Sequence, residues 1–440
     1  MGIYFGTDGI RGIVNFGLNH EVIFRCGNAL AHLNPKAKVI IGSDTRVSGE
    51  YISALFASGA TMAGLNVIDV GVCPTAGVSY LTKKVGADFG VVISASHNPP
   101  EYNGIKIFDS TGQKFGDKKE DELESFFGKL VIAKPSQIGS FVRNEKLVKE
   151  YEKHLKNLAS NSLEGLKIVL DLANGASHKI APKVFRELGV KVVAMHSSKM
   201  GEKINVCCGA TCPQELAKMV KKYKADLGFS FDGDADRIIA ADENGNIVDG
   251  DLILYILAKY LKEKDELKNS MVVGTRHTNL RIEEALETFG IKLLRTDIGD
   301  KYVIQKMMEL GLSLGGEKSG HIILKECGVT GDGIAVAIKI AQIVKEKGKK
   351  LSNLLNLKLY PQININVEVE DKMRVINSEK LANAEKILSQ ELGAKSRIML
   401  RVSGTENKVR IMVEDESEEK AKKVARELEG VILKINGENK

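Results

Sequence analysis

Three aspartates alternate in the segment Asp232-Gly233-Asp234-Ala235-Asp236-Arg237, directly after the apolar stretch 226–231. On an extended chain every second side chain points the same way, so the three carboxylates would face one another. Carboxylates this close together repel one another unless a divalent cation neutralises their charge. Oxygen ligands favour Mg²⁺, Mn²⁺ or Ca²⁺. An EF-hand does not fit, because Arg237 stands where glycine is needed and strands flank the loop. The pattern predicts a metal site, with a phosphatase-type aspartate nucleophile and a solvated acidic turn as alternatives.

A second candidate stretch is Ser94-Ala95-Ser96-His97-Asn98-Pro99, which follows the apolar run 89–93. The run has the character of a buried strand, and the residues after it are typical of a loop. In open α/β sheets, ligands bind at the C-terminal ends of the strands. We therefore expect Ser94, Ser96 and His97 at an edge where chemistry takes place, although the stretch alone also fits an ordinary turn.

Two glycine-containing loops carry groups that suit a sugar phosphate. Glu317, Ser319 and His321 alternate carboxylate, hydroxyl and imidazole, which suits hydroxyl-rich ligands, with His321 a candidate proton carrier or a structural histidine. Arg401 and Arg410 flank the loop Ser403-Gly404-Thr405, whose hydroxyl and N–H groups suit a phosphate unless the segment is a charged hairpin.

The elements that must position these loops alternate between strand and helix. We predict strands at 38–42, 66–71, 89–93, 103–108, 166–172, 190–196, 226–231, 238–241, 271–274, 291–295, 312–314, 363–369, 397–401 and 409–414. We predict helices at 50–63, 75–85, 178–188, 214–223, 251–262, 279–289, 300–310, 332–347, 378–391 and 417–429, with 117–160 charged and mostly helical and 5–12 a loop. The alternation indicates α/β units with parallel or mixed sheets, in four domains at 1–155, 156–252, 253–361 and 362–440.

Composition narrows the class of protein. The 440 residues carry a net charge of +6 without a block of like charges, Trp is absent and aromatic residues make up 5%. We therefore expect no nucleic acid as partner. No apolar run approaches the ~20 residues of a membrane span and no signal peptide is visible, so we expect a cytoplasmic protein that does not bind membranes.

Six cysteines are present, and Cys207, Cys208 and Cys212 lie close together in the sequence. They could serve a soft metal, but the spacing is not C-x2-C and no second ligand pair follows. The sequence favours reduced thiols in a cytoplasmic enzyme.

Six loops together resemble the signature loops of the α-D-phosphohexomutases, in order and spacing, across essentially the whole chain. They are Thr7–Gly12, Ser94–Pro99, Asn103–Lys106, Asp232–Arg237, Gly316–His321 and Arg401–Glu406. The resemblance implies four domains around a central cleft: three related α/β mixed-sheet domains and a smaller C-terminal α+β domain.

The resemblance also implies roles for individual residues. Ser96 would be the phosphoserine, and Mg²⁺ would be held by its phosphate oxygen with Asp232, Asp234 and Asp236. The other implied catalytic groups are Arg11, His97, Lys106, Arg237 and His321, with Lys106 and His321 as candidates for proton transfer. Sugar hydroxyls would contact Glu317 and Ser319, and the substrate phosphate would be bound by Arg401, Ser403, Gly404, Thr405 and Arg410.

Within the superfamily, the chain most resembles the bacterial members that interconvert glucosamine 6-phosphate and glucosamine 1-phosphate. Ser96 would phosphorylate the sugar to a 1,6-bisphosphate, which turns end for end before Ser96 reclaims the other phosphate. The product would feed the synthesis of UDP-N-acetylglucosamine and cell-wall precursors, and a homodimer is compatible with the resemblance. Mannose or glucose phosphates are the alternative substrates, because Lys318 stands where glutamine is usual among the glucosamine phosphate enzymes. In the metal loop, Ala235 replaces a common glycine.

Overall fold

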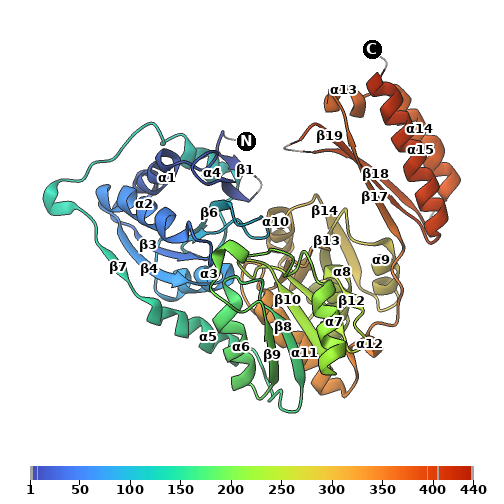
Figure 1. Cartoon of the computed structure of the whole chain (residues 1–440), viewed down its shortest axis with the longest axis horizontal. Coiled ribbons are helices and arrows are strands. Elements are labelled where there is room, and N and C mark those ends of the chain that lie inside the picture. Colours follow the sequence, from blue (N-terminus) through green and yellow to red (C-terminus); the bar gives the residue numbers. More distant parts are fainter. Residues whose placement is uncertain (1–2, 7, 394, 404–405, 438–440) are drawn as a thin grey trace. The chain divides into compact units, whose positions relative to one another are not determined.

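The computed structural model describes residues 3–6, 8–393, 395–403 and 406–437 (Figure 1). The chain divides into two compact units, Met1–His277 with Gly290–Asn356, and Thr278–Phe289 with Leu357–Lys440. We call them unit 1 and unit 2. Unit 1 contains three sheets and unit 2 contains one, among the residues that the structure describes.

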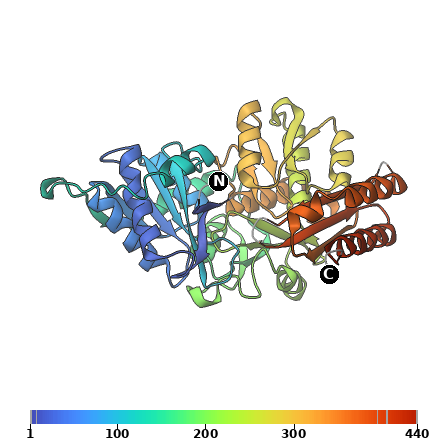
Figure 2. The ribbon, with the colours of Figure 1, turned by 90° about the horizontal axis from the view of Figure 1, so that it is seen from above.

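The first sheet of unit 1 has the strand order β1-β2-β6-β5-β3-β4-β7. Its strands are β1 Phe5–Gly6, β2 Gly9–Ile13, β3 Lys38–Ser43, β4 Asn66–Val72, β5 Phe89–Ile93, β6 Tyr102–Asp109 and β7 Phe141–Arg143. Its helices are α1 His20–Leu33, α2 Gly49–Met62, α3 Thr75–Lys84, α4 Asp117–Glu124 and α5 Val148–Asn157, and they lie on both faces (Figures 1 and 2). Every residue of β5 is buried, as expected for a central strand covered on both sides.

The second and third sheets repeat the same plan with fewer strands. The second, ordered β12-β11-β10-β8-β9, contains β8 Lys167–Asp171, β9 Lys191–Met195, β10 Leu227–Phe231, β11 Ile238–Asp242 and β12 Ile247–Val248, with α6 Ser177–Glu187 and α7 Gln214–Tyr223. The third, ordered β14-β13-β15-β16, contains β13 Met271–Thr275, β14 Lys292–Thr296, β15 Leu314–Gly316 and β16 Ile322–Leu324, with α8 Gly250–Glu263, α10 Asp300–Leu310, α11 Gly333–Lys347 and α12 Leu351–Leu354.

One junction recurs in all three sheets of unit 1. A buried strand that is parallel to its inner neighbour is followed by an antiparallel strand, in the pairs β5–β6, β10–β11 and β15–β16. The loops at these junctions hold Ser96, the three aspartates and the segment 317–321, respectively. The prediction of three related α/β mixed-sheet domains is confirmed, and each domain contributes one candidate loop from the equivalent position.

Unit 2 is built on a three-stranded antiparallel sheet in the order β17-β19-β18, which are Gln362–Glu368, Lys408–Glu414 and Arg397–Val402. Its helices are α9 Leu280–Glu287, α13 Lys372–Ile376, α14 Glu379–Leu392 and α15 Glu418–Gly437. The two long helices α14 and α15 lie side by side against the sheet (Figures 1 and 2). Their apolar faces and the strands form a separate core that includes Leu381, Leu388, Val409, Ile411 and Leu428. The smaller C-terminal α+β domain is confirmed.

Three predictions about local structure were wrong. Residues 9–13, expected in a loop, form β2, because Arg11 and its neighbours pair with β6 in the register Arg11↔Gly104. Most of 125–147 is not helical and includes β7, since Gly128, Pro135 and Gly139 interrupt the stretch and disfavour a helix. The strand expected at 312–314 lies at Leu314–Gly316, where pairing with β16 fixes it.

Candidate active site

Ser96 lies directly after β5 and its backbone is left-handed, with φ of 51°. This conformation is costly for a residue with a side chain and is concentrated at functional sites. Its hydroxyl is almost fully buried and donates a hydrogen bond to Oδ2 of Asp232 over 2.6 Å. The serine of the first domain is therefore in direct contact with the acidic loop of the second.

Arg46 supports the loop that carries Ser96, although it was not among the predicted site residues. Its buried guanidinium donates to the carbonyl oxygens of Ser96 (3.1 Å), Asn98 (2.8 Å) and Tyr102 (2.9 Å), and also to that of Pro99. Asp44 pairs with Arg46 over 3.0 Å in a fully buried salt bridge. The polar residues 43–46 after β3 were the available signal, because they end a buried strand at the same sheet edge as Ser96.

The three aspartates converge, although not for the reason predicted. The segment after β10 is a turn and not an extended strand, because Ala235 has φ of 58° and its N–H donates to the carbonyl of Asp232. All three carboxylates are buried and offer oxygen atoms within 4.8 Å of one another. Gly233 permits the close approach of the serine loop, since a Cβ there would lie 2.5 Å from the carbonyl oxygen of Ser96.

Lys106 compensates the charge of this cluster. Its ammonium lies 3.0 Å from Asp234, 3.1 Å from Asp236 and 3.1 Å from Asp8. Burial opposes the charged form, but these carboxylates raise the pKa of Lys106 well above its usual value. Arg11 pairs with Asp8 and donates to the side chain of Asn98 over 3.1 Å, so it too lies beside the serine loop.

Two carboxylate oxygens in the cluster are buried without a hydrogen-bond partner: Oδ1 of Asp234 and Oδ1 of Asp236. The opposite oxygen of Asp234 is occupied, accepting from Thr75 Oγ1 (2.6 Å) and Lys106 Nζ (3.0 Å). Buried oxygens without partners are costly unless something binds them. Three hard oxygen donors in this arrangement fit a divalent cation, so the acidic triad can bind a metal.

His97, Arg237 and His321 surround the serine–aspartate contact. Arg237 Nη1 lies 3.0 Å from His97 Nδ1, and its backbone N–H donates to Asp232. Burial and the charge of Arg237 lower the pKa of His97 to about 3, so this ring is neutral. Burial opposes protonation of His321, but the charge of Asp236, whose Oδ2 lies 3.8 Å from His321 Nδ1, raises its pKa to about 9. The predicted catalytic residues of unit 1 are therefore grouped around Ser96.

The candidate sugar-recognition loop lies at the junction of β15 and β16. Glu317 is almost fully buried, and its Oε1 accepts a hydrogen bond from the Gly299 N–H over 2.9 Å. Burial raises the pKa of Glu317, while the nearby charges of His321 and Arg237 oppose that shift. Ser319 is exposed, and the charge of Lys318 lies close enough to Asp249 to oppose the rise in the pKa of that buried carboxyl.

The candidate phosphate loop is in unit 2, between β18 and β19. Arg401 and Arg410 are directly opposite each other in the antiparallel register, and Arg410 Nη2 donates to Ser403 Oγ over 3.3 Å. Partial burial and the charge of Arg410 lower the pKa of Arg401. Like charges placed opposite each other are unfavourable until an anion neutralises them. The predicted residues Gly404 and Thr405 lie outside the described residues.

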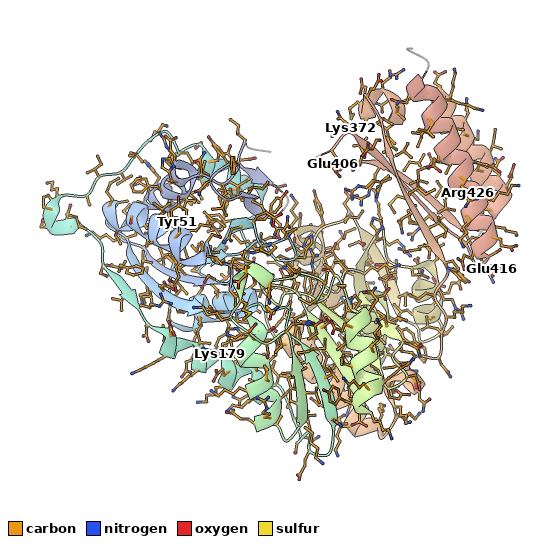
Figure 3. All side chains as sticks on the ribbon, viewed as in Figure 1. Tyr51, Lys179, Lys372, Glu406, Glu416 and Arg426 are labelled. Carbon is orange, nitrogen blue, oxygen red and sulfur yellow. The ribbon has the colours of Figure 1, made fainter. Side chains whose placement is uncertain are left out.

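The loop of unit 2 is supported from its far side by Lys372. Its ammonium donates to the carbonyl oxygens of Ser403 over 2.7 Å and Glu406 over 3.2 Å, and Lys372 and Glu406 lie close together in Figure 3. The two carbonyl oxygens are therefore occupied by a cation of the protein itself. The arrangement suits a loop that binds an anion through side chains and N–H groups.

Comparison with known proteins agrees with this architecture. The family models for phosphoglucomutase/phosphomannomutase match the chain in four consecutive parts: α/β/α domain I at residues 2–131, α/β/α domain II at 149–245, α/β/α domain III at 249–360 and the C-terminal domain at 365–431. The chain belongs to the phosphoglucomutase/phosphomannomutase family. The predicted membership of the phosphohexomutase superfamily is thereby confirmed.

Similar curated proteins have a more specific name than the family, phosphoglucosamine mutase. Phosphoglucosamine mutase of Caldanaerobacter subterraneus subsp. tengcongensis is 45% identical over 98% of this chain and 99% of its own length. Phosphoglucosamine mutase of Clostridium acetobutylicum is 44% identical over 99% of both chains.

Among solved structures, a phosphoglucomutase/phosphomannomutase family protein from Burkholderia thailandensis matches with a TM-score of 0.84 at 22% identity, covering 99% of this chain and 98% of its own. Aspergillus fumigatus N-acetylphosphoglucosamine mutase, solved with GlcNAc-6P and magnesium, matches with a TM-score of 0.71 at 18% identity, covering 99% and 96%. At these identities the structures support the fold. In the described part of the chain, no helix is long and apolar enough to cross a membrane.

Proposed function

We propose that this chain is a phosphoglucosamine mutase that interconverts glucosamine 6-phosphate and glucosamine 1-phosphate through a phosphoserine. The observation that carries the proposal is the contact between Ser96 and Asp232, within a buried acidic cluster that has two oxygens without partners. A serine ester can store a phosphoryl group between two half-reactions. The identity to curated phosphoglucosamine mutases over nearly the whole chain supports the amino sugar.

The residues of unit 1 would perform the transfer. The sugar hydroxyl would attack the phosphorus of phospho-Ser96 and release its proton, the bond from phosphorus to Ser96 Oγ would break, and Oγ would take a proton in its place. Asp232, Asp234 and Asp236 would hold Mg²⁺, which neutralises charge on the transferring phosphoryl group when bound. Arg237 and Arg11 would add positive charge beside the same group, and Lys106 and His321 would be the candidates for proton transfer.

The bisphosphate intermediate must expose first one and then the other phosphate to Ser96. The arginine pair in unit 2 would hold the phosphate that is not reacting, together with Ser403 and the loop 404–405. Guanidinium groups recognise phosphate without reading the sugar, so this site can accept both orientations. Glu317 and Ser319 would contact the sugar hydroxyls.

Lys318 bears on the preference for an amino sugar. At ~4 Å and an effective dielectric near 20, two like charges cost about 4 kcal/mol, so a lysine that faced the ammonium of glucosamine phosphate would prevent binding. Lys318 lies close enough to Asp249 for its charge to act on the pKa of that buried carboxyl, so an acidic partner within the protein is available to it. This supports glucosamine phosphate as the substrate.

The remaining assignments are proposals of the same kind. We place the protein in the cytoplasm, with a phosphorylated amino sugar as its partner and Mg²⁺ as its cofactor. We keep the division into domains at 155, 252 and 361. A homodimer remains compatible with the resemblance.

The test is a coupled assay of glucosamine 6-phosphate, glucose 6-phosphate and mannose 6-phosphate with wild type, Lys318→Gln and Ser96→Ala. We expect kcat/KM to be highest for glucosamine 6-phosphate in wild type, and Ser96→Ala to be inactive. Mass spectrometry should locate phosphate on Ser96 in part of the purified protein. A preference for a neutral hexose that Lys318→Gln reverses would overturn the substrate, and a fully active Ser96→Ala would overturn the mechanism.

A further inference from the structure

A second group of metal-ligating side chains lies in the second domain, apart from the aspartate triad. Asp171 ends β8, His196 follows β9, and Cys208 lies in the loop before α7. One ligand atom from each lies within 4.8 Å of the other two. The three residues are up to 37 positions apart in the chain, so their meeting is a product of the fold.

Asp171 is the fixed centre of this group. Its carboxylate is fully buried, with Oδ1 2.9 Å from His196 Nδ1 and Oδ2 accepting from the Gly209 N–H over 2.9 Å. The Ala173 N–H donates to Oδ1 over 3.1 Å. The carboxylate thus orients both the imidazole and the loop that carries Cys208.

Two further donor side chains border the group. Glu215 Oε2 lies 3.5 Å from His196 Nε2, on the exposed side. Cys212 is half-exposed and lies near enough to Cys208 to contribute to the raised pKa of that thiol. Cys207, by contrast, is exposed, although it also contributes to that shift.

The backbone around the group is held in unfavourable conformations. Ala173, His196 and Cys207 all have left-handed φ values, of 50°, 46° and 52°. Each such residue costs roughly 1–3 kcal/mol and persists only when its surroundings impose it. A bound ion that fixes Asp171, His196 and Cys208 together would offset part of this cost.

The group does not have the character of a reactive thiol. Burial, and then the charge of Asp171, raise the pKa of Cys208 to about 12. Reactive cysteines have the opposite environment, in which positive charge lowers the pKa.

We propose that Asp171, His196 and Cys208 form a second metal site, for a zinc-class divalent cation. A mixed set of sulfur, nitrogen and oxygen donors in four-coordinate geometry suits Zn²⁺, whereas Mg²⁺ takes oxygen ligands. The site therefore selects a different ion from the aspartate triad.

The site has a structural connection to the serine loop. Asn205, in the same segment as Cys208, donates through Nδ2 to the carbonyl oxygens of Ser96 over 2.8 Å and Asn98 over 3.1 Å. A cation bound at Cys208 would hold the segment that supports the reacting serine. Its role would be to position that loop, not to take part in the phosphoryl transfer.

The test uses the full-length protein, stripped of metals and kept in excess Mg²⁺ so that the aspartate triad is occupied. Titration with Co²⁺ should produce the thiolate-to-cobalt charge-transfer absorption, saturating at one equivalent, and Zn²⁺ should abolish it by displacement. Cys208→Ser should remove the absorption. The matched control is Cys207→Ser, at the exposed neighbouring thiol, which should retain it.

Substitution of the buried Cys208 could disturb folding, so two further variants leave this cysteine unchanged. His196→Gln, at a side chain that is 26% exposed, should weaken Co²⁺ binding at least tenfold with an unchanged circular dichroism spectrum. Asp234→Asn should leave the absorption intact, because the triad is a separate site. Absence of the charge-transfer band in wild type, or a full band in both Cys208→Ser and His196→Gln, would overturn the proposal.

Discussion

At the scale of single residues, Ser96 depends on groups that no short motif contains. Its left-handed backbone is supported by Arg46, which collects carbonyl oxygens from the serine loop, and by Ser94, whose Oγ accepts from the Ser96 N–H over 2.8 Å. Ser94 in turn donates to Asp44 over 2.6 Å. Ser96 is thus the end of a buried chain of hydrogen bonds that begins at Arg46.

Arg46→Lys should lower kcat about tenfold to a hundredfold and leave KM for the sugar phosphate nearly unchanged. Lysine keeps the charge but loses the planar set of donors, and each hydrogen bond to a charged group contributes roughly 1.5–3 kcal/mol. Steady-state kinetics separates kcat from KM. Arg143→Lys is the control, because Arg143 is exposed and pairs with Glu145. Equal kcat in the two variants would contradict the positioning role.

At the scale of elements, the sequence predicted the strands and loops that depend on a local pattern of residues. The buried strand β5 is a continuous apolar run, and β10 has large apolar residues at alternate positions. Polar loops after both strands mark the sheet edge, so both strands and both loops were predicted. The features that the sequence did not predict depend on contacts between distant segments. β2 is a strand because β6 lies beside it, and Arg46 matters because the Ser96 loop turns back over it. The Cys208 group escaped for the same reason, since Asp171 and His196 lie in other elements.

Helix α4 carries a carboxyl group whose burial predicts a pH effect on stability. Burial raises the pKa of Glu120 from 4.5 to about 7. When the pKa of a carboxyl is raised in the folded state, the protein loses stability as the pH rises from about 4.5 to about 7, because the folded state opposes ionisation of that carboxyl. Glu120→Gln should therefore raise the free energy of unfolding by about 3 kcal/mol at pH 8 and by far less at pH 5.

The measurement is the thermal midpoint of unit 1 at the two pH values. Glu122→Gln, at an exposed position of the same helix, is the control and should show no pH-dependent gain. If Glu120→Gln is destabilising at pH 8, the charged carboxylate has a favourable partner and the argument fails.

The strands β18 and β19 carry a prediction about substrate binding. Arg410→Ala should raise KM for the sugar phosphate about tenfold to a hundredfold, since a charge-assisted contact to phosphate contributes roughly 1.5–3 kcal/mol. Stability should not fall, because the change removes a like charge opposite Arg401. Arg426→Ala, on the exposed face of α15 (Figure 3), is the control. An unchanged KM and kcat/KM would place the phosphate elsewhere.

At the scale of the whole molecule, unit 2 is not a continuous piece of chain. It includes Thr278–Phe289, from within the stretch that the third family domain covers. The Leu280 N–H donates to Glu414 over 2.7 Å, and Arg397 donates to the Thr278 carbonyl over 3.1 Å. The boundary predicted at 361 therefore divides the sequence but does not separate the two compact units.

A chain that ends at Asn356 should keep unit 1 folded but lose the protection of 278–289. The hydrogen-bond partners of this segment in β18 and β19 are then missing, so its backbone becomes open to proteolysis. Limited proteolysis followed by mass spectrometry should find new cleavage between 278 and 289 and none within β5 or β10. Full protection of 278–289 in the shortened chain would show that unit 2 does not need it.

The contact between Leu280 and Glu414, 134 residues apart, also sets an order of events during protein synthesis. Helix α9 leaves the ribosome long before β19 exists, so the nascent chain carries this helix without its partner while the intervening residues are translated. The sheets of unit 1 that precede α9 can form during that interval, whereas unit 2 must await almost the last residues. A ribosome stalled late in the message would therefore hold a chain with the Ser96 loop already in place and the strand β19 not yet made.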